Sequence, residues 1–281
     1  LPAGLRVEKE KIDLELCRRQ EGYGRGARMR IEKDKVEILS GLYKGKTIGS
    51  PLGILIENRD FSLERQPEIL NPRPGHADLA GLLKYGFADA RPVLERASAR
   101  ETAARVAVGA VGKILLSEFD ISVSSKVLAI GAKTSQEEIR KAIDQAIRRK
   151  DSLGGVFELK IKGVSAGLGS YVQPDKRLNA RLSQAVMSIP GIKAVEFGLG
   201  CECASRFGSK VHDAIYYAKE KGYYRKTNNA GGIEGGISNG QEIVLRAYMK
   251  PIATLNKPLS SVDIRSKKAV LASIQRADTC A

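Results

Sequence analysis

The segment from Arg73 to Thr102 contains the side chains best suited to chemistry. His76, one of two histidines in the chain, follows a Pro-Gly pair and shares the segment with four arginines and one lysine. Imidazole titrates near neutral pH, whereas guanidinium stays charged and binds oxyanions through its planar fork. This combination predicts a site for a polyanionic ligand that must also exchange a proton. The cations of the segment are Arg73, Lys84, Arg91, Arg96 and Arg100.

A second basic group lies near the start of the chain, where three glycines interrupt a run of arginines. Guanidinium forks bind phosphate and carboxylate bidentately, and glycine lets the backbone approach a ligand closely. Ligand binding and a solvated basic surface both remain open for this group. Its arginines are Arg18, Arg19, Arg25 and Arg28.

Three later stretches also contain candidate site residues. The glycine-rich stretch 231–240 is neither a Walker A loop nor a Rossmann fingerprint, so a network of turns and a ligand cradle both remain open. Lys250–Thr254 ends an expected strand with a cation and a hydroxyl. Asp278 follows Arg276 by two residues, either as a surface pair or as a base that its neighbour holds ionised. His212 is interpreted as structural.

The composition narrows the class of partner. Lys and Arg outnumber Asp and Glu by 47 to 32, a net charge of +15, which indicates an anionic ligand or simply a charge-rich surface. Aromatic residues make up 5% and no nucleic-acid-binding motif stands out, so we expect no nucleic acid partner. No apolar run approaches the roughly 20 residues of a membrane span. The four cysteines form no disulfide framework and are expected to be thiols in a reducing cytoplasm, without metal.

Helical spacing of apolar residues predicts the elements that position these side chains. Helices are expected in residues 8–20, in a stretch that Ser98 caps, in a stretch that Ser135 caps, and from Leu178 until Pro190 ends it. In the second of these, Ala104, Val108, Val111 and Leu115 mark the expected apolar face, and interspersed small residues predict close packing.

Alternating or continuous apolar runs predict the strands. They fall within residues 36–58, 157–161 and 243–249. Because helices and strands alternate irregularly, we predict an α+β fold with antiparallel sheets. No linker or composition break divides the chain, so we expect a single domain over residues 1–281.

Five blocks, in this order, resemble the chorismate synthase family. They are RRQEGYGRGARM (Arg18–Met29), RPGHADLAGLLKYG (Arg73–Gly86), LERASARETAARVAVGAV (Leu94–Val111), NNAGGIEGGISNGQ (Asn228–Gln241) and RADTCA (Arg276–Ala281).

The resemblance implies a lyase of the shikimate pathway of aromatic amino-acid biosynthesis. Its small-molecule substrate would be 5-enolpyruvylshikimate-3-phosphate, converted to chorismate and phosphate by anti-1,4-elimination. Reduced FMN (FMNH2) is implied as the cofactor although the reaction has no net redox change, and NADPH is implied as a candidate flavin reductant. The implied fold places helices between antiparallel sheets, and the implied assembly is a cytoplasmic homotetramer.

The resemblance also implies roles for individual residues. His76 matches a histidine that assists protonation of the reduced flavin, and Asp278 matches a carboxylate that relays a proton from substrate to flavin N5. Arg19 and Arg25 match positions for NADP or substrate, and Arg28, Arg73 and Arg100 match arginines that hold the substrate's phosphate and carboxylates. The positions matched to FMN contacts are Arg96, Ala97, Ser98, Pro190, Gly191, Gly235, Lys250, Pro251, Ile252, Ala253, Thr254 and Arg276.

Some features depart from the family pattern. The family's Gly-Glu-Ser-His-Gly segment, with a second proton-handling histidine, would lie before Leu1, and an Ala/Pro-rich helix would follow Ala281. The stretch 60–74 is also shorter than usual. We therefore expect these residues to be the ordered part of a longer polypeptide, because they alone would lack one acid.

A basic anion- or nucleic-acid-binding scaffold without catalysis is the alternative interpretation. It predicts no flavin binding and a steep salt dependence of nucleic-acid affinity. A flavin titration followed by fluorescence separates the two.

Overall fold

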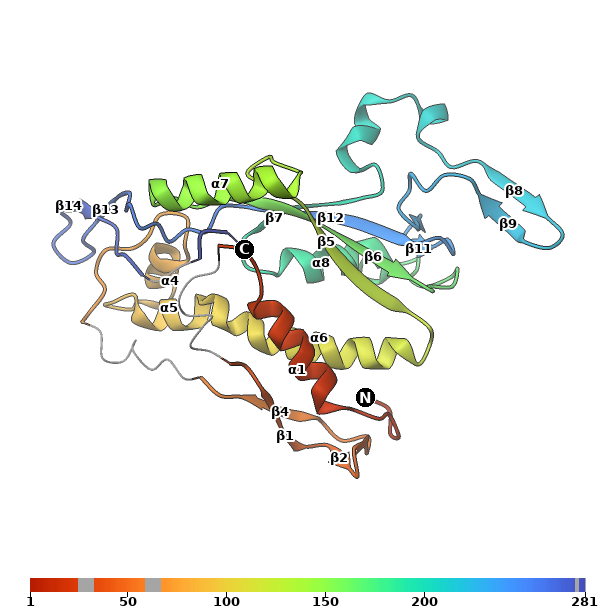
Figure 1. Ribbon diagram of the computed structural model, residues 1–281, viewed down its shortest axis with the longest axis horizontal. Coiled ribbons are helices and arrows are strands. Elements are labelled where there is room, and N and C mark those ends of the chain that lie inside the picture. Colours follow the sequence, from red (N-terminus) through yellow and green to blue (C-terminus); the bar gives the residue numbers. More distant parts are fainter. Residues whose placement is uncertain (25–32, 59–66, 276–277, 281) are drawn as a thin grey trace. The chain divides into compact units, whose positions relative to one another are not determined.

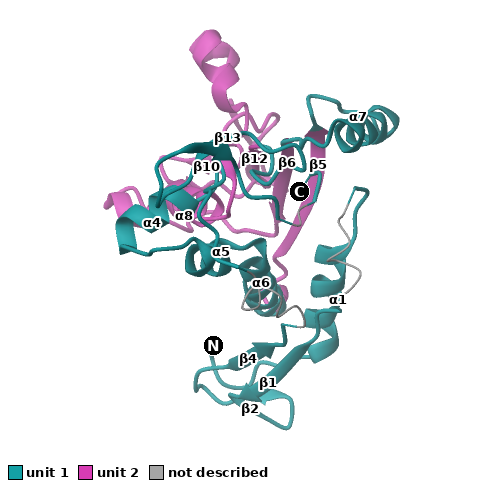
Figure 2. Ribbon diagram, turned by 90° about the vertical axis from the view of Figure 1, so that its left-hand side faces the viewer, with its two compact units in different colours: residues 1–115, 130–154, 251–281 teal, residues 116–129, 155–250 magenta. Residues whose placement is uncertain are grey.

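The computed structural model describes residues 1–24, 33–58, 67–275 and 278–280. The chain divides into two compact units (Figure 2): residues 1–115, 130–154 and 251–281 form unit 1, and residues 116–129 and 155–250 form unit 2. The expectation of a single domain stays a prediction, because compactness does not test whether the units fold independently. The predicted α+β class with antiparallel pairing is confirmed.

Unit 1 contains a helix-and-strand layer whose core joins α1, β1 and α6 (Figure 1). The predicted first helix is α1 (Lys9–Gln20), and Ile12 and Leu16 are fully buried on one face of it. Strand β1 (Val36–Ser40) pairs antiparallel with β4 (Gly53–Ile56), with Val36 opposite Ile56. The short strands β2 (Leu42–Tyr43) and β3 (Lys46–Thr47) form the hairpin between them.

Helix α6 (Thr102–Ser117) lies where the sequence predicts it, but its buried face is different. Val108, expected in the core, is 65% exposed, whereas Ala103, Ala107 and Ala110 are buried. Val111, also expected in the core, and Ile114 are buried beside this alanine stripe. The expected face is therefore confirmed at Val111 and wrong at Ala104 and Val108, which are exposed, and the expected close packing stays a prediction.

Unit 1 also contains further helices and one more hairpin. Two helices, α4 (Asp78–Tyr85) and α5 (Arg91–Ala97), pack around Leu82 and Ala90. Helix α7 (Gln136–Arg149) begins as predicted, because the Ser135 hydroxyl accepts from Glu138 N. Strands β13 (Ser260–Val262) and β14 (Ala269–Leu271) form a hairpin in the last segment.

In unit 2, the described residues form a four-stranded sheet in the order β5-β6-β12-β7. The strands are β5 (Ser122–Ile130), β6 (Gly155–Lys162), β7 (Ile192–Phe197) and β12 (Ile243–Met249). Leu245 and Ala247 of the central β12 pack with Val186 of α8 (Leu178–Met187), so this helix covers one face of the sheet. The predicted strand 243–249 is confirmed at both ends.

The other elements of unit 2 are short. Two antiparallel hairpins are β8 (Ile215–Ala218) with β9 (Gly222–Arg225), and β10 (Ile233–Glu234) with β11 (Ile237–Ser238). Three 3₁₀ turns are described, over Pro174–Lys176, Gly200–Ser205 and Gly208–Lys210.

Candidate active site

His76 lies on a tight turn immediately before α4. Its backbone N–H donates to the carbonyl of Arg73 at 3.3 Å, and Gly75 between them adopts a φ of 76°, which favours glycine. The turn leads into Asp78, the first residue of α4. Arg73, His76 and Asp78 therefore occupy one short stretch whose backbone is folded back on itself.

Asp78 is the centre of this group and is completely buried. Its Oδ2 accepts from the backbone N–H of Arg73 at 3.0 Å and from Arg73 Nε at 2.9 Å. Its Oδ1 accepts from an Arg73 terminal nitrogen at 3.1 Å and lies 2.5 Å from Nδ1 of His76. Both carboxylate oxygens thus have charged or titratable partners.

These partners decide the charge of the buried acid. Burial alone would raise the pKa of the Asp78 carboxyl, but the hydrogen bonds from His76 and Arg73 outweigh it and hold this pKa well below its usual range. Asp78 is therefore a carboxylate at neutral pH, and its charge is matched by the Arg73 guanidinium. A buried ion pair of this kind is stable only when its geometry and hydrogen bonds are good.

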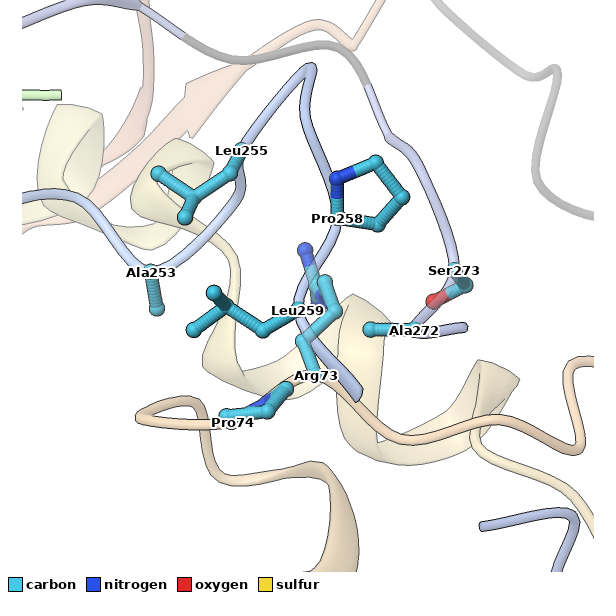
Figure 3. A pocket seen from close by; sticks show the side chains of 8 residues that line it. All are labelled: Arg73, Pro74, Ala253, Leu255, Pro258, Leu259, Ala272 and Ser273. Carbon is cyan, nitrogen blue, oxygen red and sulfur yellow. The ribbon is translucent and has the colours of Figure 1, made fainter. Parts of the chain in front are cut away.

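Arg73 also ties the group to a distant part of the chain. Its remaining terminal nitrogen donates to the hydroxyl of Thr254 at 2.6 Å. Figure 3 shows the Arg73 side chain in a small hollow with Pro258, Leu259 and Ala272 around it. The hollow is far smaller than the roughly 300–1,000 Å³ of ordinary ligand pockets and has room for about one water-sized group.

A second group in unit 1 is built around another buried acid, Asp34. Arg19 donates to its Oδ2 at 3.3 Å, and Arg100 contacts its Oδ1. Arg19 also donates to Thr102 Oγ1 at 3.1 Å and to the Ala99 carbonyl at 3.0 Å. The two predicted ligand-binding arginines therefore converge on one carboxylate at the start of α6.

Ser98 lies beside this second group and caps a helical turn, as predicted. Its hydroxyl accepts from Arg100 N at 3.2 Å, but the turn is a 3₁₀ segment, Ala99–Glu101, that leads into α6. The Glu101 side chain pairs with Arg105 at 2.8 Å. Arg96 and Ala97 end α5 just before this cap, so the predicted Arg96–Ser98 stretch is the joint between two helical segments.

Several predicted cofactor residues fall in unit 2, at the start of β7 and the end of β12. Gly191 has a φ of 89°, and its carbonyl accepts from Lys250 N at 3.0 Å, which places Pro190, Gly191 and Lys250 together. Burial lowers the pKa of the Lys250 ammonium, and the nearby Lys193 ammonium lowers it further. An anionic group bound here would relieve that repulsion.

The glycine-rich stretch of unit 2 forms a network of turns. Gly235 and Gly236 have φ values of 59° and 91° and form the two-residue turn of the β10–β11 hairpin, the conformation for which glycine is preferred. Asp213 holds the preceding residues through Thr227, Asn229 N and Ala230 N, both amides at 2.9 Å. Burial raises the pKa of the Asp213 carboxyl, but these hydrogen bonds outweigh it and lower the pKa. The turn-network interpretation accounts for this stretch, and His212 beside it is exposed.

The remaining predicted residues lie in the last segment of the chain. The Ile252 carbonyl accepts from the Ser152 hydroxyl at 2.6 Å, and Ala253 lines the hollow beside Arg73. Thr279, next to Asp278, accepts from Leu153 N at 2.9 Å. The joint action of Asp278 and His76 stays a prediction. Pro251 links unit 2 to this segment. Arg25, Arg28 and Arg276 lie outside the described residues.

Sequence reasoning missed the two buried acids, Asp78 and Asp34, and the pairing of Thr254 with Arg73. A signal existed for Asp78, because an acid two residues after a histidine at a helix start can reach the ring. For Asp34 and Thr254 we find none: Arg19 and Arg100 lie 15 and 66 positions from Asp34, and Arg73 lies 181 positions from Thr254.

Within the described part of the chain, no group of three or more His, Cys, Asp or Glu residues could hold a metal ion. No helix there is long and apolar enough to cross a membrane.

Comparison with known proteins gives one consistent result. The family model described as chorismate synthase matches residues 1–281. The chain is 58% identical to a chorismate synthase of Thermoanaerobacter pseudethanolicus and 55% identical to one of Caldanaerobacter subterraneus subsp. tengcongensis, covering all of this chain and 81% of each relative. A chorismate synthase crystal structure superposes with a TM-score of 0.77 at 44% identity, over 89% of this chain and 78% of that one. These similarities do not favour the non-catalytic scaffold.

Proposed function

Because this chain belongs to the chorismate synthase family and is a lyase, we propose that the Arg73–His76–Asp78 group holds and exchanges a proton during its elimination reaction. The substrate is 5-enolpyruvylshikimate-3-phosphate. A C–H bond of its ring and the C–O bond to phosphate break, a new double bond forms, and chorismate and phosphate leave. The observation that supports the proposal is His76, whose Nδ1 lies 2.5 Å from a fully buried carboxylate.

The charges of the site fit both halves of this reaction. The departing phosphate needs cations, and proton transfer needs a positioned acid or base. The resemblance assigns the substrate's ring proton to Asp278 and protonation of the reduced flavin to His76. Arg19 and Arg100 converge at the start of α6, where a phosphate or carboxylate would meet two guanidinium groups. His76, with a partly exposed ring held on one side by Asp78, can receive or return a proton on its other side.

The residues present also fit a reduced flavin. In the described part of the chain, the buried hydroxyl oxygen of Ser273 has no hydrogen-bond partner, and it lines the hollow beside Arg73 and Ala253. Lys250 and Lys193 repel each other, which suits an anionic group such as the FMN phosphate. When bound, reduced FMN supplies an electron-rich ring that can share charge with the substrate and recover it. Within unit 2, Gly191 and Lys250 are the residues we expect to contact its phosphate.

Family membership alone supports three finer proposals. They are NADPH as a flavin reductant, with Arg19 among its contacts, a homotetrameric assembly, and a cytoplasmic location. NADPH-dependent flavin reduction followed by absorbance tests the first, and sedimentation of the full-length protein tests the second. Imaging of the tagged protein in cells tests the third.

The full-length protein with anaerobically reduced FMN should release phosphate from 5-enolpyruvylshikimate-3-phosphate and form chorismate. His76→Ala should lower turnover by about 10²–10⁴-fold, the range of general acid–base catalysis, while substrate binding changes little. His212→Ala, on an exposed side chain of unit 2, is the matched control. Absence of phosphate release by the unaltered protein would overturn the proposal, and a loss of binding in His76→Ala would assign His76 to substrate binding.

A further inference from the structure

We propose that Asp78 is a positioning residue that fixes His76 in the Nδ1–H tautomer and so leaves Nε2 as the nitrogen that exchanges the proton. This inference rests on the proposed function for the role of His76, although the tautomer itself can be measured without substrate or flavin. Asp78 belongs to none of the residues that the family resemblance assigns to the site.

The contact between the two side chains requires a proton between them. Nδ1 of His76 and Oδ1 of Asp78 are 2.5 Å apart. An ionised carboxylate only accepts hydrogen bonds, whereas a neutral imidazole donates through one nitrogen and accepts through the other. A bare Nδ1 would point a lone pair at a negative oxygen, so Nδ1 must be the donor. Hydrogen bonds from His76 and Arg73 lower the pKa of the Asp78 carboxyl despite its burial, which keeps the proton on the ring.

Arg73 prevents the carboxylate from turning away. Its backbone N–H and Nε both donate to Oδ2, at 3.0 and 2.9 Å, and a terminal nitrogen donates to Oδ1 at 3.1 Å. The same terminal nitrogen lies 3.1 Å from Nδ1 of His76. A guanidinium cannot accept, so with Nδ1 protonated this nitrogen must donate to the carboxylate. The three Arg73 groups and Nδ1 of His76 then all donate, and the Asp78 carboxylate accepts from each of them.

The two oxygens of Asp78 have different partners, and this difference predicts how an Asp78→Asn variant would orient its amide. In Asp78→Asn the carbonyl oxygen should take the Oδ2 position, because two Arg73 donors converge there. The amide NH2 would then occupy the Oδ1 position and donate to Nδ1 of His76. The ring should respond by moving its proton to Nε2. A carboxylate that only stabilised the start of α4 through the helix dipole would produce no such exchange.

The test is nitrogen-detected NMR of the full-length protein labelled at its histidine ring nitrogens, at a pH at which the ring is neutral. His76→Gln identifies the His76 signals by their loss. We expect Nδ1 to be protonated in the unaltered protein and Nε2 to be protonated in Asp78→Asn. Asp175→Asn, an exposed acid of unit 2, should leave the His76 signals unchanged.

The experiment distinguishes a failure of this inference from a failure of the proposed function. A protonated Nε2 in the unaltered protein, or an unchanged tautomer in folded Asp78→Asn, would overturn the inference. If Asp78→Asn fails to fold by circular dichroism, the unaltered protein still decides it through its own tautomer. An inactive protein with Nδ1–H intact would overturn the proposed function and leave the role of Asp78 in positioning the ring standing.

Discussion

Asp78 in unit 1 and Asp213 in unit 2 are both buried carboxylates whose pKa is lowered by hydrogen bonds that outweigh burial. Asp78 contacts two charged or titratable side chains, Arg73 and His76. Asp213 instead accepts from a threonine hydroxyl and two backbone amides. The difference teaches that the partners of a buried acid, more than its burial or pKa, distinguish a site that can move protons from one that only folds a loop.

The largest expected effect follows from removing the ion pair of unit 1. Asp78→Ala leaves the Arg73 guanidinium, which is 6% exposed, buried without its carboxylate. Breaking a buried pair by removing one partner destabilises by about 3–5 kcal/mol. Urea denaturation should show this loss, whereas Asp175→Ala on an exposed side chain should stay within about 0.5 kcal/mol. A change below 1 kcal/mol would remove the basis for treating Asp78 as the centre of the site.

The corresponding change in unit 2 should be smaller. Asp213→Ala leaves a hydroxyl and two backbone amides without their acceptor, and each unsatisfied neutral donor that stays buried costs about 1–3 kcal/mol. Because the loop can open to water, we expect the total for the three donors to stay within that range, near its upper end, by urea denaturation. The ring signals of His76 should not move. An effect as large as that of Asp78→Ala would mean that the two acids do not differ in kind.

The pH dependence of stability sharpens the comparison further. The pKa of Asp78 is lower in the folded protein than in the unfolded chain, where Asp titrates near about 3.9. Its contribution to the free energy of unfolding is therefore present above that pH and is lost as the pH falls toward the folded pKa. One proton changes the slope by at most about 1.4 kcal/mol per pH unit.

Urea denaturation between neutral and acid pH checks this expectation. Asp78→Asn should show a shallower loss of stability below about pH 4 than the unaltered protein. Identical slopes in the two proteins would contradict the assignment of a depressed pKa to Asp78.

The smallest expected effect concerns the hairpin of unit 2. Gly235 has a φ of 59° with open space where a Cβ would lie, so Gly235→Ala should cost about 1–2 kcal/mol through left-handed strain, and Gly235→Asn should cost less. Thermal unfolding measures both. If Gly235 also contacts FMN as the family resemblance implies, Gly235→Asn should weaken flavin binding in a fluorescence titration despite its stability. Unchanged binding would make Gly235 a turn residue only.

Much of the fold followed from local patterns. The spacing of Ile12 and Leu16, the Ser135 cap and the apolar run 243–249 each predicted an element that the structure contains. The buried face of α6 did not follow, because large apolar residues such as Val108 were assumed to mark the core. Three alanines, Ala103, Ala107 and Ala110, mark it together with Val111 and Ile114.

The site was predictable only in part, for a similar reason. Residue types pointed to His76 and Arg73, and the family resemblance gave them roles. Asp34 and Thr254 became partners only through contacts between distant segments, and no local pattern encodes such a contact. The expected role of Arg73 in substrate binding stays a prediction, and its described contacts are with Asp78, Thr254 and His76.

The hydrogen bond between Arg73 and Thr254 also has a consequence during biosynthesis. The two residues are separated by 181 positions, and unit 1 needs residues from its third segment, 251–281, to be complete. At about 5–20 residues per second, a ribosome adds Thr254 roughly 10–40 s after Arg73. Over that interval the turn from Arg73 to His76 lacks the hydrogen bond from Arg73 to Thr254. All of unit 2, in contrast, has already been synthesised when Thr254 is added. A chaperone that shields nascent chains would therefore meet unit 1 in an incomplete state for longer than unit 2.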